Sequence, residues 1–342
     1  MKIEINLSIK YLNLKKDFVS NKGVTNGVSQ LYVTVNEDNE IGYGVSGLID
    51  NNIDQAILSE LEVFLNKSVT NENPFHLIEN MKFFRMKSKS IQLSLEMACL
   101  DWIGKKQKKR VSQMFYSEVW RDIYYTSLSI SSLPLNELIQ EVLNFAHWPI
   151  LKFKVSSMEE IYRLQEVRNH YNGKIWVDGN GALELQEAIE AAKFLSTVGV
   201  ELLEQPLSPN NLKDFQTLYQ HSPIKLVADE DCKTIEDIDK VKRCSNVVNI
   251  KLSKCASMFE AYEMIKKAKE QDLEVMLGCK TESVIGVNAI AQFIPLADYC
   301  DLDGAVDIEN DLFRGLEIHQ GKICLNQLPG LGVIPSNNKG GF

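Results

Sequence analysis

Short apolar runs alternate with amphipathic stretches along the chain from about residue 120 onwards. Each run is rich in β-branched residues, which predicts a buried strand, and each following stretch has the apolar stripe of a helix that covers a sheet. The starts of successive runs are 23 to 26 residues apart. A strand, a helix and two loops fit that period, and eight such units are the number that closes a (β/α)8-type barrel. The runs are YYTSLSI (124–130), ILKFKV (150–155), KIWVDGN (174–180), VELLEQP (200–206), IKLVADED (224–231), VVNIKLSK (247–254), LEVMLGC (273–279) and YCDLDG (299–304).

The N-terminal third has a different pattern. Apolar and polar residues alternate over 2–14 and 30–36, which predicts two antiparallel strands. The polar stretch between them, 17–29, predicts a mobile loop. Helical patterns follow at 53–66 and, with a more convincing apolar stripe, at 88–107. Strands followed by helices indicate an α+β domain.

Composition and charge exclude several classes of protein. The chain has 37 Lys and Arg against 46 Asp and Glu, a net charge of −9, which argues against a protein that binds nucleic acid through its phosphates. No apolar run reaches about 18 residues, so no membrane span is predicted. The seven cysteines are odd in number and lack a C-x-x-C pair, so neither a disulfide framework nor a cysteine–zinc site is expected. The first residues alternate as in a strand and not as in a signal peptide, so we expect a cytoplasmic protein; the sequence leaves open whether it forms a homo-oligomer.

Charged side chains gather at the ends of the predicted barrel strands. The active site of such a barrel is built at the carboxyl ends of its strands, whereas strands buried on both faces are mostly apolar. The residues concerned are Lys152 and Lys154 on the second strand, Asp178 and Asn180 on the third, Glu204 on the fourth, Asp229, Glu230 and Asp231 on the fifth, Lys251 and Lys254 on the sixth, and Asp301 and Asp303 on the eighth. We therefore expect the functional site at this end of the barrel.

Three of these acids, Asp178, Glu204 and Asp229, come from successive strands and should converge. Each alone is equally well explained as a loop acid or a helix cap that faces solvent. Three carboxylates held close together, however, repel one another unless a cation lies among them. Oxygen ligands without histidine or cysteine favour Mg²⁺, so we predict that these three residues bind Mg²⁺.

Two lysines flank the predicted metal site. Lys154 and Lys251 lie on the second and sixth strands, which places them on opposite sides of the barrel mouth. Lysines usually extend along the surface into solvent. An amine close to Mg²⁺ and to a second ammonium, here that of Lys152, has its neutral form favoured and can act as a base. We predict that Lys154 and Lys251 are the catalytic bases.

A series of motifs runs through the chain in a fixed order. They are K-x-K (152–154), D-x-N (178–180), E-Q-P (204–206), A-D-E (228–230) and N-I-K-L-x-K (249–254), together with MACLDWIGK (97–105), TSLSI (126–130) and PGLGV (329–333). This series resembles the enolase superfamily, specifically its muconate-lactonizing-enzyme subgroup. The resemblance implies a modified TIM barrel, (β/α)7β, over residues 119–319 and an α+β capping domain over 1–118. It also implies that the segment 320–342 packs back on the capping domain.

The motif on the last predicted strand indicates which substrate the protein binds. D-x-D at 301–303 resembles the motif with which the dipeptide epimerases of this subgroup hold the α-ammonium group of the substrate, and G-C-x-x-E-S at 278–283 resembles their seventh-strand signature. Two carboxylates on one face of a strand suit a cationic group. The resemblance therefore implies that Asp301 and Asp303 bind a dipeptide. It also implies substrate-binding roles for Lys152, Lys280, Thr126 and Lys22, and supporting roles for Asn180 and Glu230.

The activity implied is inversion of a carbon next to a carboxylate by 1,1-proton transfer. Lys154 would serve one face of the carbon and Lys251 the other, through an enediolate that Mg²⁺ stabilises. The segments 17–29 and 43–52 would close over the substrate. Lys280 stands where these epimerases usually have methionine, and 17–29 carries no arginine. We expect these two departures to set specificity for the second residue of the dipeptide.

Other functions stay open. Within the superfamily they are o-succinylbenzoate synthase, N-acylamino acid racemase and a muconate-type cycloisomerase, although D-x-D counts against all three. A dehydratase of the mandelate-racemase type would need a catalytic histidine at a late strand end, and the five histidines lie elsewhere. A non-catalytic barrel that only binds a ligand should have lost a metal acid or a lysine, and all of them are present.

Overall fold

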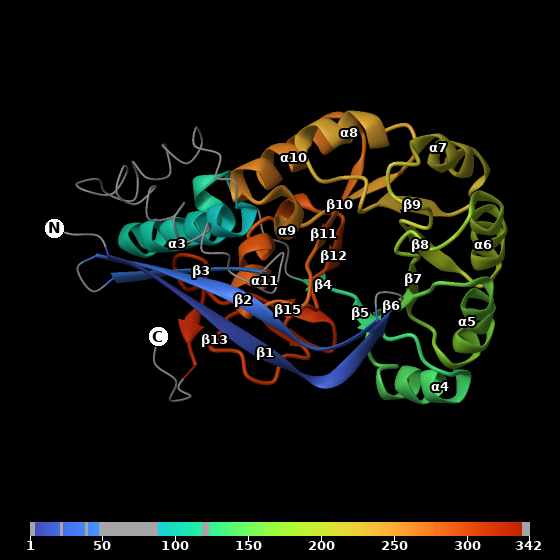
Figure 1. Cartoon of the computed structure of the whole chain (residues 1–342), viewed down its shortest axis with the longest axis horizontal. Coiled ribbons are helices and arrows are strands. Elements are labelled where there is room, and N and C mark those ends of the chain that lie inside the picture. The colour runs from blue at the N-terminus through green and yellow to red at the C-terminus, as the bar shows by residue number, and fades with distance from the viewer. Residues whose placement is uncertain (1–3, 21–22, 38–39, 48–87, 118–122, 337–342) are drawn as a thin grey trace.

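Eight parallel strands form the centre of the molecule in a computed structural model, which describes residues 4–20, 23–37, 40–47, 88–117 and 123–336 (Figure 1). The strands are β5 (Leu128–Ile130), β6 (Ile150–Lys154), β7 (Lys174–Asp178), β8 (Val200–Glu204), β9 (Lys225–Ala228), β10 (Val247–Ile250), β11 (Glu274–Gly278) and β12 (Tyr299–Asp301). They pair in chain order from β5 to β12. At the seam between the first and last strands, the Ser127 N–H donates to the Cys300 carbonyl (3.1 Å) and the Leu302 N–H to Thr126 Oγ1 (2.7 Å). The eight predicted strands are thus confirmed.

Helices follow the first seven strands and cover the barrel from outside (Figure 1). They are α4 (Leu135–Asn144), α5 (Met158–His170), α6 (Leu185–Thr197), α7 (Leu212–His221), α8 (Ile235–Val241), α9 (Leu252–Cys255), α10 (Met258–Glu270) and α11 (Val284–Ala291). In the described part of the chain, β12 is followed by short strands and by no helix: β13 (Phe313–Arg314), β14 (Glu317–His319), β15 (Lys322–Cys324) and β16 (Ile334–Pro335). The architecture is therefore the predicted (β/α)7β barrel. Its constant repeat reflects one strand and one covering helix for each unit.

The interior of the barrel is filled by apolar side chains of alternate strand positions. One buried layer consists of Ile150, Trp176, Leu202, Val227, Val247 and Met276, and Tyr299 packs against it. Because successive strand residues point to opposite faces, the neighbouring positions face the covering helices. The barrel is a packed core, and only its ends are available for chemistry.

An antiparallel sheet and one long helix precede the barrel. The sheet has the order β1 (Glu4–Ser20), β2 (Gly23–Glu37) and β3 (Glu40–Gly47), and the helix is α3 (Lys89–Gln107). A Cβ atom at Gly44 would lie 1.8 Å from the Ser94 carbonyl oxygen, so only glycine lets β3 approach α3 this closely. The strands predicted at 2–14 and 30–36 and the helix at 88–107 are confirmed, whereas the helix at 53–66 lies outside the described residues.

The loop predicted over 17–29 is wrong in the residues that the structure describes. Residues up to Ser20 continue β1 and residues from Gly23 begin β2, and their register shifts between Asn13 and Phe18. This hairpin crosses the barrel mouth (Figure 1). It is fixed to the segment after β12, where Lys15 N–H donates to the Asp307 carbonyl (2.8 Å) and the Glu309 N–H donates to that of Asn13 (2.9 Å). Pairing between β1 and β2 therefore holds the polar stretch in extended form, and the hydrogen bonds of Asn13 and Lys15 fix the strand that leads into it.

The C-terminal residues contact the helix that precedes the barrel. The Leu331 N–H donates to the buried carboxylate of Asp101 in α3 (2.7 Å), and a Cβ at Gly104 would lie 2.6 Å from Gly330 Cα. Arg110, just after α3, donates to the Asn326 carbonyl (2.7 Å). No helix in the described part of the chain has the length and apolar character of a membrane span.

Glu96 of α3 caps a barrel helix. Its Oε1 accepts the Met258 N–H at the start of α10 (2.5 Å) and its Oε2 accepts the Ser257 hydroxyl (2.9 Å). The side chain is buried, and burial raises the pKa of Glu96 from 4.5 to about 7 although these hydrogen bonds lower it. The folded protein therefore binds this proton more tightly than the unfolded chain.

This pKa predicts a pH-dependent contribution to stability. Because the pKa is raised on folding, the contribution is complete below about pH 4.5 and is lost as the pH rises through about 7. Glu96→Gln keeps the cap but does not titrate. The free energy of unfolding of the variant should therefore rise relative to wild type by about 3 kcal/mol between pH 4.5 and 8. Urea unfolding measured across this range, with the exposed Glu263→Gln of α10 as control, checks it; parallel curves would contradict it.

Candidate active site

The charged residues predicted from the strand ends meet at one end of the barrel. Parallel pairing places Lys154 beside Asp178 and Asp178 beside Glu204, at the last positions of β6, β7 and β8. Asp229 follows β9 directly, and Lys251 follows β10. Because these carboxyl ends share one rim, residues far apart in the chain become neighbours, such as Lys152 and Asp301, which are 149 positions apart.

Lys152 lies at the centre of the acids. Its ammonium is 2.7 Å from Glu204 Oε2, 2.8 Å from Asp301 Oδ2 and 3.3 Å from Asp178 Oδ2. Its side chain is only 3% exposed. Burial lowers the pKa of Lys152, but the three facing carboxylates raise it well above the usual lysine value. Lys152 therefore stays charged and holds the acids together.

The predicted bases lie on either side of these acids. Lys251 Nζ is 2.7 Å from Asp229 Oδ2 and 3.9 Å from Glu204 Oε1. Lys154 Nζ is 3.6 Å from Asp178 Oδ2 and 3.3 Å from Asn180 Oδ1. Asp178, Glu204 and Asp229 thus form a row with one lysine at each end.

The acids of the row differ in protonation. Burial raises the pKa of Glu204 to about 7, although Lys152 lowers it. The pKa of Asp229 is raised by burial but held well below its usual value by Lys251 and Lys254. That of Asp178 is likewise raised by burial and brought below its usual value by Lys152 and Lys154. The two aspartates are therefore anionic, and Glu204 is the acid whose negative charge most needs a further cation.

The row suits a hard divalent cation. No group of three or more His, Cys, Asp or Glu side chains in the described residues is already arranged as a metal site, because ammonium groups lie between the acids. One ammonium touches both Asp178 and Glu204, and another reaches both Glu204 and Asp229, so the three carboxylates border one volume. Glu204 Oε2 contacts Lys152 but accepts no hydrogen bond. Buried carboxylate oxygens with spare capacity are the ligands that Mg²⁺ prefers.

The two acids of the last strand have different surroundings. Asp301 is buried, and its carboxylate accepts the Ser127 hydroxyl (2.7 Å) and the Lys152 ammonium (2.8 Å). Asp303 is half-buried and accepts the Ser129 N–H (2.6 Å). Burial and the nearby charge of Asp301 raise the pKa of Asp303 to about 6. Asp303 is thus the acid that an incoming cation would stabilise more.

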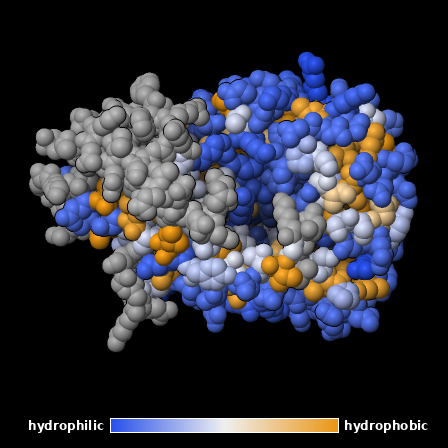
Figure 2. Space-filling model, in the orientation of Figure 1, coloured by the Kyte–Doolittle hydropathy of each residue, from blue (hydrophilic) through white to orange (hydrophobic). Residues whose placement is uncertain are grey.

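A cavity of about 110 Å³ opens at this end of the barrel. Figure 2 shows a hollow lined by hydrophilic residues on the corresponding face. Its walls come from the barrel strands and from three alternate residues of β1, Leu14, Lys16 and Phe18. Phe18 lies 5.8 Å from Lys154 Nζ, measured to the ring centre. Phe18 belongs to the segment 17–29 that the sequence predicts to close over the substrate, whereas Leu14 and Lys16 are not among the predicted site residues, although their alternation continues the period of the strand.

The other predicted site residues differ in their position relative to the cavity. Lys280 is exposed at the rim of the cavity, and its N–H donates to Glu282 Oε1 (3.2 Å). Thr126 is buried, and its hydroxyl accepts the Leu302 N–H across the seam between β5 and β12 and donates to the Ser127 carbonyl. Of the predicted metal ligands, Asp178 lines the cavity, whereas Glu204 and Asp229 are not among its lining residues, nor is Glu230, which follows Asp229. Lys22 lies outside the described residues.

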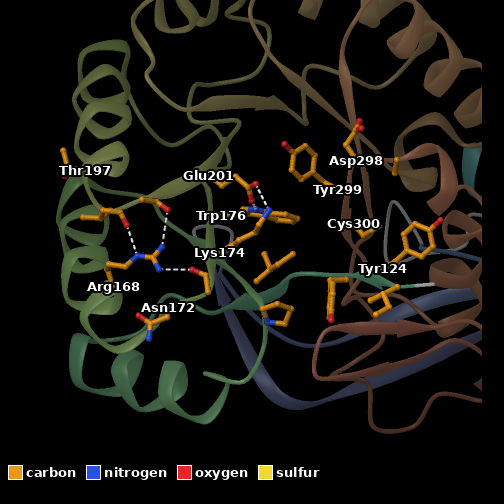
Figure 3. A pocket seen from close by; sticks show the side chains of 18 of the residues that line it. Tyr124, Arg168, Asn172, Lys174, Trp176, Thr197, Glu201, Asp298, Tyr299 and Cys300 are labelled. Carbon is orange, nitrogen blue, oxygen red and sulfur yellow. Dashed lines mark hydrogen bonds and ion pairs between the residues drawn. The ribbon is translucent and has the colours of Figure 1, made fainter. Parts of the chain in front are cut away.

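A larger cavity, of about 1090 Å³, lies at the opposite end of the barrel (Figure 3). Several of its polar groups are paired with one another: Lys174 with Glu201 (2.7 Å) and Trp176 Nε1 with Glu201 (2.8 Å). Arg168 donates to three backbone carbonyls within 2.9 Å. The amino ends of barrel strands usually serve stability, so we place the active site at the acidic end.

These features define a class: a barrel enzyme with its reactive groups at the carboxyl ends of the strands. Residues 135–339 match the family described as enolase C-terminal domain-like. The L-Ala-D/L-amino acid epimerase of Flavobacterium johnsoniae is 32% identical over 70% of this chain and 71% of its own length. The hydrophobic dipeptide epimerase of a Flavobacteria bacterium is 26% identical over 94% of this chain and 96% of its own.

A solved structure agrees with the same fold. The dipeptide epimerase of Enterococcus faecalis, in complex with Mg and L-Leu-L-Tyr, superposes with a TM-score of 0.87 at 24% identity and covers 97% of this chain and 99% of its own. The chain belongs to the enolase superfamily, and it is an isomerase of the racemase and epimerase type.

Proposed function

We propose that the protein is a Mg²⁺-dependent dipeptide epimerase. The observation that carries this proposal is the row of three buried carboxylates with Lys154 at one end and Lys251 at the other. An acidic row can hold a cation and, through it, a substrate carboxylate, while lysines on opposite sides can reach both faces of one carbon. Relatives named as dipeptide or L-Ala-D/L-amino acid epimerases support the choice of substrate.

The reaction needs a proton to leave and return at a carbon next to a carboxylate. Asp178, Glu204 and Asp229 would hold Mg²⁺, which when bound neutralises the negative charge that develops on the substrate carboxylate. Lys154 moves the proton at one face and Lys251 at the other. Lys152 keeps the surrounding acids in place, and the β1–β2 hairpin limits access of water from above.

Asp303 would receive the α-ammonium group of the dipeptide. Both Asp303 and Asp301 line the cavity, but the Asp301 carboxylate is already engaged by Lys152 and Ser127. Removing a charge-assisted contact costs about 1.5–3 kcal/mol, or roughly 10- to 150-fold. Asp303→Asn should therefore lower kcat/KM for a free dipeptide by that factor and for its N-acetylated form much less. An equal loss on both substrates would favour an N-acylamino acid racemase instead.

Lys280 would select the second residue of the dipeptide. It is exposed at the rim, and its positive charge also lies near the buried carboxylate of Glu282, whose pKa burial raises to about 7. We expect Lys280→Met to shift preference from acidic to apolar dipeptides without loss of α-proton exchange. A dipeptide library assayed with Lys280→Met and with the exposed Lys193→Met as control tests this. An unchanged order of substrates would leave Lys280 only the role of pairing with Glu282.

A further inference from the structure

Lys254 is a buried lysine that the reaction above does not use. It lies in α9, one helical turn beyond Lys251, and its side chain is 10% exposed. Its ammonium is 2.6 Å from each of three oxygens: Asp229 Oδ1, the Asp229 carbonyl and the Asn249 carbonyl. Burying an ammonium is costly unless such contacts compensate it, so these three contacts determine where the group lies.

The contacts of Lys254 join the ends of two barrel strands. Backbone pairing between β9 and β10 ends at Ala228 and Val248. Just beyond this point, the Lys254 ammonium donates hydrogen bonds to the backbone carbonyls of the next residue on each strand, Asp229 and Asn249. It therefore continues the connection between the strands where their own hydrogen bonds have stopped.

The hydrogen bonds of Lys254 also involve two of the predicted metal ligands. Lys254 donates to Asp229 Oδ1 and Lys251 donates to Asp229 Oδ2, so both oxygens of this carboxylate have a fixed partner. Asn249, whose carbonyl Lys254 also holds, donates its side-chain N–H to Glu204 Oε1 (2.7 Å). One ammonium thus constrains Asp229 directly and Glu204 through Asn249.

We propose that Lys254 is a positioning residue that orients Asp229 and Glu204 for Mg²⁺; this inference rests on the proposed function. Groups that orient metal ligands typically contribute roughly 10- to 100-fold to metal affinity. Charge alone has the opposite effect, because a nearby ammonium repels Mg²⁺ and its removal would strengthen binding. If Lys254 acts by positioning the ligands, its removal weakens Mg²⁺ binding; if it acts only through its charge, its removal strengthens Mg²⁺ binding.

Two substitutions separate these effects. Lys254→Met removes the charge and the contacts. Lys254→Arg keeps the charge, but its planar fork cannot place one nitrogen against three converging oxygens. We expect both variants to bind Mg²⁺ roughly 10- to 100-fold more weakly in calorimetric titrations with MgCl₂. Lys266→Met, at a solvent-exposed lysine of α10 that pairs with Glu263, is the control and should bind as wild type does.

The outcomes are distinct. Unchanged or tighter Mg²⁺ binding by both folded variants would overturn the positioning role. Failure of both to fold, judged by circular dichroism, would overturn it as well, because Lys254 would then serve the fold itself. If wild type binds no Mg²⁺, the proposed function fails; if wild type binds Mg²⁺ and the variants bind it equally well, only the role of Lys254 fails.

Discussion

Lys154→Ala is expected to stop α-proton exchange with one epimer of the dipeptide, and Lys251→Ala with the other. The two amines lie at opposite ends of the acidic row, so each can reach only one face of a carbon held between them. A positioned base contributes roughly 10²- to 10⁴-fold. Each variant should therefore lose epimerisation by at least that factor, while it still exchanges the proton of the epimer that the remaining lysine serves.

Deuterium incorporation from D₂O, followed by mass spectrometry with each epimer as starting material, measures this directly. Lys193→Ala, at an exposed lysine of α6, is the matched control. Two-base transfer would be refuted if both variants exchanged both epimers at the wild-type rate. A loss confined to the same epimer in both would place the lysines on one side of the substrate.

Removing the cation is expected to have an effect of similar size. Glu204→Gln keeps the shape of the side chain but removes the negative charge at the centre of the row, and EDTA removes Mg²⁺ itself. Charge stabilisation by a bound metal ion is worth several kcal/mol, so a loss of roughly 10³-fold in turnover is expected. Activity assayed against MgCl₂ concentration should show partial recovery of the variant only at high Mg²⁺.

The control for this experiment is on the same strand. Glu201→Gln changes an acid at the amino end of β8, where it pairs with Lys174, and should leave the Mg²⁺ requirement unchanged. Normal activity of Glu204→Gln at limiting Mg²⁺, or of wild type in EDTA, would exclude the metal assignment.

The barrel could be predicted from sequence because its signals are local. Each strand is a short apolar run followed by an amphipathic stretch, and the charged residues stand at the ends of these runs. Since parallel strands place their carboxyl ends on one rim, the acids and lysines could be grouped without coordinates. The extended form of 17–29 could not be predicted in this way, because it depends on pairing between β1 and β2. The residues just before it, Asn13 and Lys15, are in turn fixed to Glu309 and Asp307, far along the chain.

The surroundings of individual side chains were also beyond the sequence. Asp301 and Asp303 share a motif and both line the cavity, yet Asp301 is buried against Lys152 whereas Asp303 is only half-buried. Lys152 differs from Lys154 by its depth, which alternation alone does not give, since both point to the same side of β6. Ser127 and Ser129 belong to the motif TSLSI (126–130), but nothing in that motif indicates that they contact the two aspartates.

Asp301 and Asp303 also contribute to the seam between β5 and β12. The Ser127 hydroxyl donates to Asp301 and the Ser129 N–H to Asp303, so the proposed ammonium-binding residue Asp303 and its neighbour Asp301 also join the first strand of the barrel to the last. Occupation of the site and closure of the ring are then thermodynamically linked. A bound dipeptide resists opening of the seam, and resistance of the protein to heat and proteases should rise with the logarithm of the dipeptide concentration once this exceeds Kd.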